Sequence, residues 1–177
     1  MVYVFATLYL LFLFGLEFGF FAVFPLGGSV PNMLLLGLLG LLITMDDIAV
    51  MLYVALIGGL LWDVYSGFPP GTYTVGFLIV GTVLFFLNEH VVFFQERLKY
   101  LPLLLLIGHT ILEGWTILYG WGLGAMHLSS LVIHPLYWLT VSLYRLCYHA
   151  LLLYPVYFFA VLLDNSVRAW VRRSGVK

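Results

Sequence analysis

Five ionisable side chains interrupt segments that are otherwise apolar, and these residues are the ones best placed to do chemistry. His109 and Glu113 are four residues apart, as are Arg145 and His149, so each pair shares one face of a helix. Glu17 lies within the first apolar segment. Ionisable groups inside a membrane segment are costly, so they indicate a ligand site, a proton site, a partner contact or a structural ion pair.

The spacing predicts which of these residues meet. If the segments that carry the two pairs form a hairpin centred near Ser129, Glu113 lies level with Arg145, and His109 with His149. An arginine inside a membrane needs a carboxylate partner, so we predict a structural ion pair between Glu113 and Arg145. The alternatives are a ligand or proton site, snorkelling of the arginine to the membrane surface, and a contact with a partner subunit.

The same residues do not predict a metal centre or an enzyme. His109-x-x-x-Glu113 lacks the second histidine of the H-E-x-x-H zinc motif, and the sequence offers no evident third ligand. No G-x-S-x-G elbow, phosphate-binding loop or dinucleotide fingerprint is present in the sequence. His90, His127 and His134 fall near the ends of apolar segments, where we expect them to be solvated. We expect no metal, no cofactor and no catalysis.

The composition places these residues in a membrane. Hydrophobic residues make up 64% of the 177-residue chain and charged residues only 8%, whereas soluble domains carry about 25% charged residues. A water-soluble globule with so few charges could not cover its surface. The net charge of −1 gives no indication of nucleic-acid binding, and the single cysteine, Cys147, cannot form an internal disulfide. We therefore expect one integral membrane domain within the lipid bilayer.

The elements that position the polar residues are predicted to be about six membrane helices in one compact all-α bundle. A helix needs about 20 apolar residues to cross a hydrocarbon core of ~30 Å. The expected segments are residues 2–24, 33–45, 48–65, 72–88, 101–120 and 135–163, followed by a basic tail at 164–177. The chain opens without the basic region and cleavage site of a signal peptide, so we expect the first segment to remain.

Residues 33–62 are consistent with one long tilted helix or with two short ones. An aspartate at the centre of a membrane helix costs roughly 2.5–3.5 kcal/mol of insertion free energy. A surface turn at Thr44–Asp47, which includes both aspartates, avoids both costs, so we predict two helices. The first of them is too short to cross the bilayer unaided, and it must lie against thinned lipid or against other helices.

The basic residues predict the orientation of the chain. With six segments, Arg97, Lys99 and the tail lie on the same side as the N-terminus, which predicts that both termini are cytoplasmic. An arrangement with five segments keeps these basic residues inside and moves only the N-terminus to the outside. Charge alone does not decide between the two arrangements.

Two stretches carry a pattern that is more specific than hydropathy. The first is Pro31-Asn32, which precedes a leucine-rich run, and the second is GGLLWDVYSGFPPG at 58–71, with Gly59, Asp63, Gly67, Pro69 and Gly71. Proline lacks a backbone donor and glycine permits positive φ, so the second stretch predicts a turn at the outer membrane surface. Its aspartate is placed to reach interfacial water or to cap the next helix.

These stretches resemble MreD, a family of bacterial rod shape-determining membrane proteins. Pro31-Asn32 is similar to the start of the family's second helix, and 58–71 is similar to the family pattern G-hydrophobic-hydrophobic-x-D-hydrophobic-x-x-G-x-P-x-G. The resemblance covers residues 31–86, and Asp46-Asp47 departs from the glycine or basic residue that family members often carry.

The resemblance implies a non-enzymatic scaffold of the cell-elongation machinery in the bacterial inner membrane. Such a scaffold is expected to bind the bitopic protein MreC. It is also expected to lie near MreB filaments, a RodA-type glycosyltransferase and a class B penicillin-binding transpeptidase, and thereby to serve peptidoglycan synthesis and cell shape.

The family also looks similar in fold to the substrate-binding (S) components of energy-coupling-factor vitamin transporters. This similarity supplies the alternative function, a small-molecule binding component. In that case we expect Asp63, Glu113 and Arg145 to line a pocket that is open to the outer side.

A scaffold needs faces on which helices approach closely. Small residues four apart provide such faces, and the sequence has two of them, Gly15 with Gly19 and Ala55 with Gly59. Glu17 points away from the first face, so we expect it to reach either the bundle interior or a partner. The outer turn at 63–71 is a further expected contact for partners.

Overall fold

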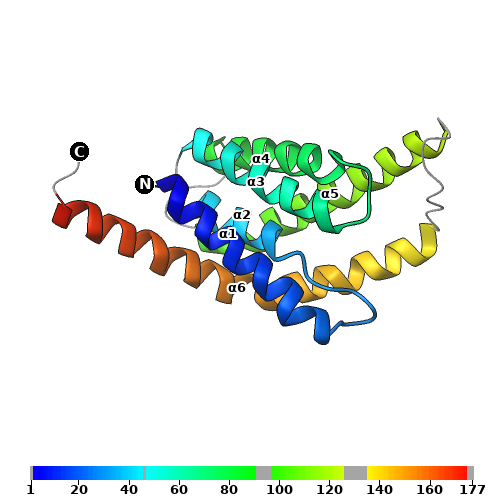
Figure 1. Ribbon diagram of the computed structural model, residues 1–177, viewed down its shortest axis with the longest axis horizontal. Coiled ribbons are helices and arrows are strands. Elements are labelled where there is room, and N and C mark those ends of the chain that lie inside the picture. The colour runs from blue at the N-terminus through cyan, green and yellow to red at the C-terminus, as the bar shows by residue number, and fades with distance from the viewer. Residues whose placement is uncertain (1, 46, 91–96, 126–134, 175–177) are drawn as a thin grey trace.

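The computed structural model describes residues 2–45, 47–90, 97–125 and 135–174 (Figure 1). The described chain is an all-helical bundle, as expected from the sequence. Its elements are α1 (Val2–Gly19), the 3₁₀ turn η1 (Phe21–Val23), α2 (Met33–Thr44), α3 (Ile48–Tyr65), α4 (Thr72–His90), α5 (Arg97–Ala125) and α6 (Pro135–Ser174).

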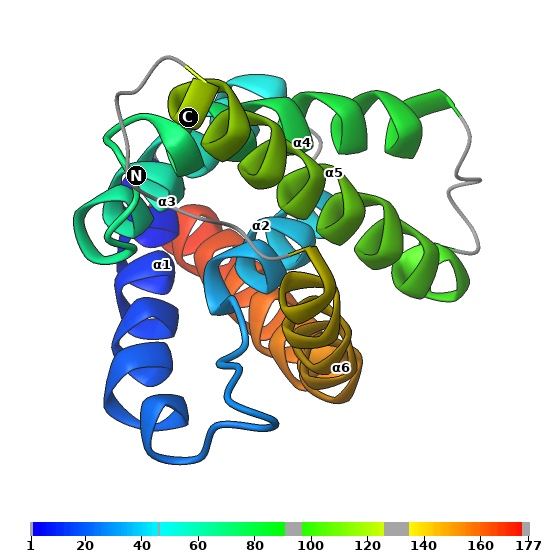
Figure 2. The same cartoon turned by 90° about the vertical axis from the view of Figure 1, so that its right-hand side faces the viewer.

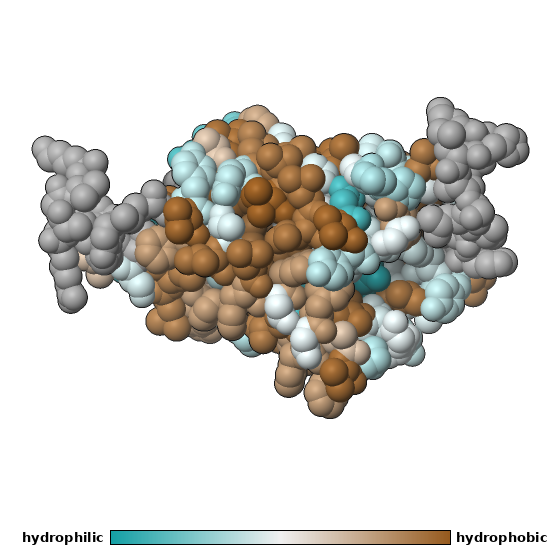
Figure 3. All heavy atoms as spheres, in the orientation of Figure 1, coloured by the Kyte–Doolittle hydropathy of each residue, from teal (hydrophilic) through white to brown (hydrophobic). Residues whose placement is uncertain are grey.

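The helices identify a multi-pass membrane protein. Five of them, all except α2, are long and apolar enough to cross a bilayer. Apolar side chains cover much of the molecular face shown in Figure 3, and polar side chains form separate patches on it. The first turn of α1 and the last turn of α6 lie toward the same end of the bundle (Figure 1).

The short helix α2 lies at the centre of the bundle (Figure 2). Every residue from Met33 to Ile43 is buried, and α2 contacts α1, α3, α4, α5 and α6. Twelve residues span about 18 Å at 1.5 Å per residue, well short of a ~30 Å hydrocarbon core. Neighbouring helices rather than lipid therefore surround this helix, which is one of the two environments expected for so short a segment.

Residues 33–62 form two helices, as predicted, and the break between Thr44 and Ile48 falls at the expected turn. Met45 is extended and ends α2, while the Asp47 side chain caps α3 by accepting a hydrogen bond from Ala49 N at 2.8 Å. This N-cap satisfies one of the backbone donors that the first turn of every helix leaves free. Asp46 lies outside the described residues.

Three helices differ from the expected segments by several residues at one or both ends. Helix α1 ends at Gly19 rather than near 24, and η1 follows it. Helix α5 covers Arg97–Ala125 rather than 101–120, and α6 passes Pro155 and continues to Ser174, so the basic tail begins as helix. An ion pair between Arg168 Nε and Asp164 Oδ2 at 2.7 Å supports this extension, because residues four apart are neighbours on a helix surface.

Candidate functional site

The first turn of α2 begins inside the bundle, and side chains from α1 and α6 complete its hydrogen bonds. Met33 N donates to Glu17 Oε2 at 3.0 Å, and Asn32 N donates to His149 Nε2 at 2.8 Å. Asn32 is itself the N-cap, since its Oδ1 accepts from Leu35 N at 2.9 Å. Backbone donors buried away from water must find partners within the protein, and these side chains supply them.

The second pair of polar contacts joins α5 to α6. Arg145 Nη1 donates to Glu113 Oε1 at 2.5 Å, which is the ion pair expected from the spacing. His109 and His149 also meet as expected, with their ring centroids 5.3 Å apart in an edge-to-face arrangement. His109 Nε2 lies 2.9 Å from Ser142 Oγ. These contacts fix the register of α5 against α6.

Together these residues form one group, which we call the polar cluster: Glu17, Asn32, His109, Glu113, Ser142, Arg145 and His149. Four of its members are buried, since Glu17 and His149 are 0% exposed, His109 is 4% and Glu113 is 7% exposed, whereas the Arg145 side chain is 19% exposed. Among the described residues, Glu17 Oε1, Glu113 Oε2 and His149 Nδ1 are buried without a hydrogen-bond partner. Two of these three atoms are carboxyl oxygens, which accept hydrogen bonds. His149 Nδ1 is a donor, because Nε2 of the same neutral ring accepts from Asn32 N.

A cleft of about 550 Å³ lies between α5 and α6 and reaches the polar cluster. Its polar lining comprises His109, Glu113, Ser142 and Thr110. The rest of the lining is apolar or aromatic, namely Leu106, Gly114, Ile117, Trp121, Trp138, Leu139, Leu143 and Leu146. Such a combination of an apolar wall with a few polar groups is typical of small-molecule sites.

The cleft differs from the pocket expected for a transporter component. Glu113 lines the cleft and Arg145 is bonded to Glu113, but Asp63 is not part of the lining. Asp63 instead caps the N-terminus of α4. This placement removes one of the polar groups that the alternative function assigned to the pocket.

Asp63, at the end of α3, caps α4 with both carboxylate oxygens. Its Oδ1 accepts from Tyr73 N at 2.7 Å, and its Oδ2 accepts from Gly71 N at 2.9 Å, from Thr74 N at 3.1 Å and from Thr74 Oγ1 at 2.5 Å. A carboxylate at a helix N-terminus also complements the positive end of the helix dipole. Gly67 and Gly71 have φ of 69° and 93°, which only glycine adopts readily. The turn at 63–71 is therefore a structural joint between α3 and α4.

The two expected packing faces have different surroundings. Gly59 lies against the backbone of Thr74 so closely that a Cβ atom would overlap it, and Ala55 faces Gly81. The Ala55 and Gly59 face is thus used inside the chain, by α4. Gly15 and Gly19 are exposed, and a Cβ atom at either position would meet nothing within 4 Å. That face is open to lipid or to a partner.

The remaining predicted polar residues add no further site. His90 is exposed, and its Nδ1 lies 3.0 Å from Phe86 O. His127 and His134 lie outside the described residues. Within the described part of the chain, His, Cys, Asp and Glu side chains form no group of three or more that is arranged to hold a metal ion.

Sequence reasoning missed the bonds that complete α2. The position of Asn32, directly before a leucine-rich run, is the usual signal of an N-cap and could have indicated its role. The hydrogen bonds from Asn32 N to His149 and from Met33 N to Glu17 join residues that are distant in the sequence, and no local sequence pattern predicts them.

Comparisons with protein-family models, with curated proteins and with solved structures found no match to this chain. Its proposed role therefore rests on the resemblance carried by residues 31–86 and on the geometry described above.

Proposed function

We propose that this protein is a non-enzymatic membrane scaffold of the bacterial cell-elongation machinery, similar in role to MreD. The observation that carries the proposal is the structural part played by the residues that resemble the family signature. Asn32 caps α2, Asp63 caps α4, and Gly59 admits the backbone of α4. Helix caps and close-packing glycines determine how helices are joined and packed. A resemblance in these residues therefore supports a similar fold and, by analogy, a similar role.

The scaffold acts by side-by-side recognition of membrane helices. Helices in lipid associate through close packing, and small residues allow their backbones to approach. The open face of Gly15 and Gly19 on α1 offers such a surface. Aromatic rings stand beside it, with the Phe14 and Phe18 centroids 4.7 Å apart and the Phe18 and Tyr65 centroids 4.9 Å apart. These rings pack against one another beside the Gly15 and Gly19 face.

The partner that fits this surface is a protein with a single membrane helix, as MreC has. A RodA-type glycosyltransferase and a class B penicillin-binding transpeptidase are the integral neighbours expected in the same complex. The basic end of α6, with Arg168, Arg172 and Arg173, lies toward the end of the bundle that holds the N-terminus (Figure 1). In the inner membrane, with both termini cytoplasmic, it is placed near MreB filaments and anionic lipids.

Co-purification tests the proposal. The tagged chain, extracted in mild detergent from a rod-shaped bacterium, is expected to retain a bitopic protein with a coiled coil and a periplasmic domain. Retention of an ATPase module together with a vitamin would instead establish the alternative, a transporter S component, which the small-molecule character of the α5–α6 cleft favours.

Asp63→Asn, scored for cell shape, tests the signature itself, and normal rods would count against an MreD-like role for it.

A further inference from the structure

The mouth of the α5–α6 cleft is apolar. Four of its lining residues are strongly exposed, namely Leu106, Trp121, Leu139 and Leu143 at 47%, 54%, 61% and 55%. Helices α5 and α6 diverge toward the end of α5 (Figures 1 and 2), and both are long enough to cross the bilayer. The cleft therefore opens toward acyl chains rather than toward water, so a ligand would enter it from the lipid phase.

The polar end of the cleft has an unpaired acceptor. Glu113 lines the cleft, is 7% exposed, and has one oxygen bonded to Arg145 while the other, Oε2, is buried without a partner among the described residues. His109 and Ser142 already bond to each other, and the Thr110 hydroxyl donates to Leu106 O. The Arg145 guanidinium balances the charge of Glu113, so its free oxygen requires a neutral hydrogen-bond donor. The lining also contains an unpaired donor, the buried Trp138 Nε1.

The volume of the cleft separates two kinds of occupant. A helical turn about 10 Å wide and 5.4 Å high occupies roughly 400 Å³, and a membrane-crossing helix has more than five turns. At about 550 Å³ the cleft holds little more than one such turn. It lies within the range of about 300–1,000 Å³ that is usual for small-molecule sites.

We propose that this cleft binds one molecule of a neutral amphiphile from the bilayer, whose hydroxyl or amide N–H donates a hydrogen bond to Glu113. The apolar part of the molecule lies along Ile117, Leu139, Leu143 and Leu146. This binding site is independent of the scaffold role and goes beyond it, because it assigns a ligand class to the polar cluster.

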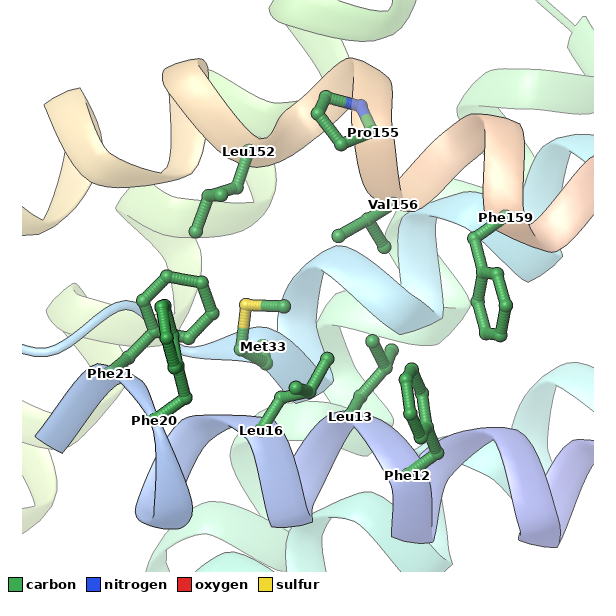
Figure 4. Close-up of a pocket in the computed structure, with 10 residues that line it drawn as sticks. All are labelled: Phe12, Leu13, Leu16, Phe20, Phe21, Met33, Leu152, Pro155, Val156 and Phe159. Carbon is green, nitrogen blue, oxygen red and sulfur yellow. The ribbon is translucent and has the colours of Figure 1, made fainter.

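A second groove provides a comparison within the same molecule. It has a volume of about 300 Å³, and α1 and α6 form its two sides, with Met33 of α2 between them (Figure 4). All of its lining side chains are apolar, among them Phe12, Phe159 and Val156. Without a polar anchor, this groove accepts an acyl chain of any lipid and discriminates no head group.

Photolabelling in lipid nanodiscs tests the proposal. Two probes share an 18-carbon chain that carries a diazirine and an alkyne; one ends in a hydroxyl group and the other in a methyl group. The hydroxyl probe is expected to label the cleft segments 106–121 and 138–146 about five-fold more than the methyl probe, the effect of about one net hydrogen bond. Both probes should label the α1–α6 groove equally. Equal labelling of the cleft by the two probes would overturn the proposal.

Matched variants sharpen this test. Leu139→Trp fills the mouth of the cleft and should abolish the preference for the hydroxyl probe, whereas Leu151→Trp, at an exposed position of the same helix outside the cleft, should preserve it. The double variant Glu113→Leu, Arg145→Leu removes the polar anchor without leaving an unpaired charge. It should still bind the 18-carbon chain of both probes but lose the preference for the hydroxyl probe. A preference that survives in the double variant would contradict the assignment of Glu113.

Two further outcomes would also overturn the proposal. An ammonium-ended probe that labels the cleft more strongly than the hydroxyl probe would identify a cation site. Loss of cleft labelling when a co-purified single-span protein is present would identify the cleft as a docking site for a helix.

Discussion

Glu17, Glu113 and Arg145 are ionisable side chains in an interior that offers no bulk water, and each has a definite partner. Glu113 and Arg145 bond to each other, and Glu17 accepts from Met33 N. The energetic cost of burying such groups is offset only while these partners are present. Removal of one member of the Glu113 and Arg145 pair should therefore lower the free energy of unfolding more than removal of both.

Arg145→Leu should lower the free energy of unfolding by about 3–5 kcal/mol, because it leaves the Glu113 carboxylate buried without its ion-pair partner. The double change Glu113→Gln, Arg145→Gln should cost clearly less. Reversible unfolding in mixed micelles measures both. Arg168→Leu removes an arginine whose side chain is 59% exposed and should cost about 0–1 kcal/mol. Equal and additive losses from Glu113 and Arg145 would show that the two residues do not act as a pair.

The sequence predicted the contacts between polar residues on neighbouring helices, but it did not predict the contact that depends on the path of a loop. Residues of two neighbouring helices keep a fixed register, so the spacing from Glu113 to Arg145 and from His109 to His149 was sufficient to pair them. The bond from Asn32 N to His149 depends on how a loop returns into the bundle. Loop paths have no periodicity, so the sequence does not encode this contact in a readable pattern.

Helices α2 and α4 show how elements of this bundle are joined. Each begins at a buried or half-buried turn, and in each case a carboxyl group from the preceding long helix accepts hydrogen bonds from its first residues. Hydropathy predicted that both helices exist, because apolar runs and turn residues are local signals. It did not predict that α6 continues past 163, because a charged helical extension and an irregular basic tail have the same composition.

The contact between α3 and α4 yields a test with adjacent glycines. Gly59→Ala should lower the free energy of unfolding by about 1–3 kcal/mol, because its Cβ would be forced against the backbone of Thr74. Gly58→Ala is the matched control: its Cβ would lie 3.8 Å from the Phe77 ring, an ordinary contact, and alanine favours the helix by about 1 kcal/mol. Thermal unfolding in detergent ranks the two, and equal stability of the variants would contradict the close packing of α3 on α4.

The whole molecule combines an apolar core, in which a small polar cluster is buried, with an apolar exterior. Its buried polar residues complete helices, and its outer faces are left for lipid and partners. On the proposed function, partner binding belongs to the exterior, and above all to the exposed face of Gly15 and Gly19 on α1.

The double change Gly15→Leu, Gly19→Leu should reduce retention of the bitopic partner about ten-fold or more while the chain remains folded, because bulky side chains block close approach of a second helix. A Cβ atom at either position would meet nothing within 4 Å in the described chain, and both positions are exposed, so the change should not disturb folding. Gly122→Leu, at another open and exposed glycine, is the control. Full retention by the double variant, measured by quantitative co-purification, would exclude this face as the docking surface.

The buried polar residues hold the bundle together, and the stability of Glu17→Leu tests this role most directly. Loss of the acceptor leaves Met33 N unsatisfied in the interior and should lower the free energy of unfolding by about 1–3 kcal/mol. Glu89→Leu, at an exposed position, should change it by less than about 0.5 kcal/mol. An unchanged or higher stability of Glu17→Leu would contradict the claim, because removal of a residue kept for binding commonly stabilises a protein.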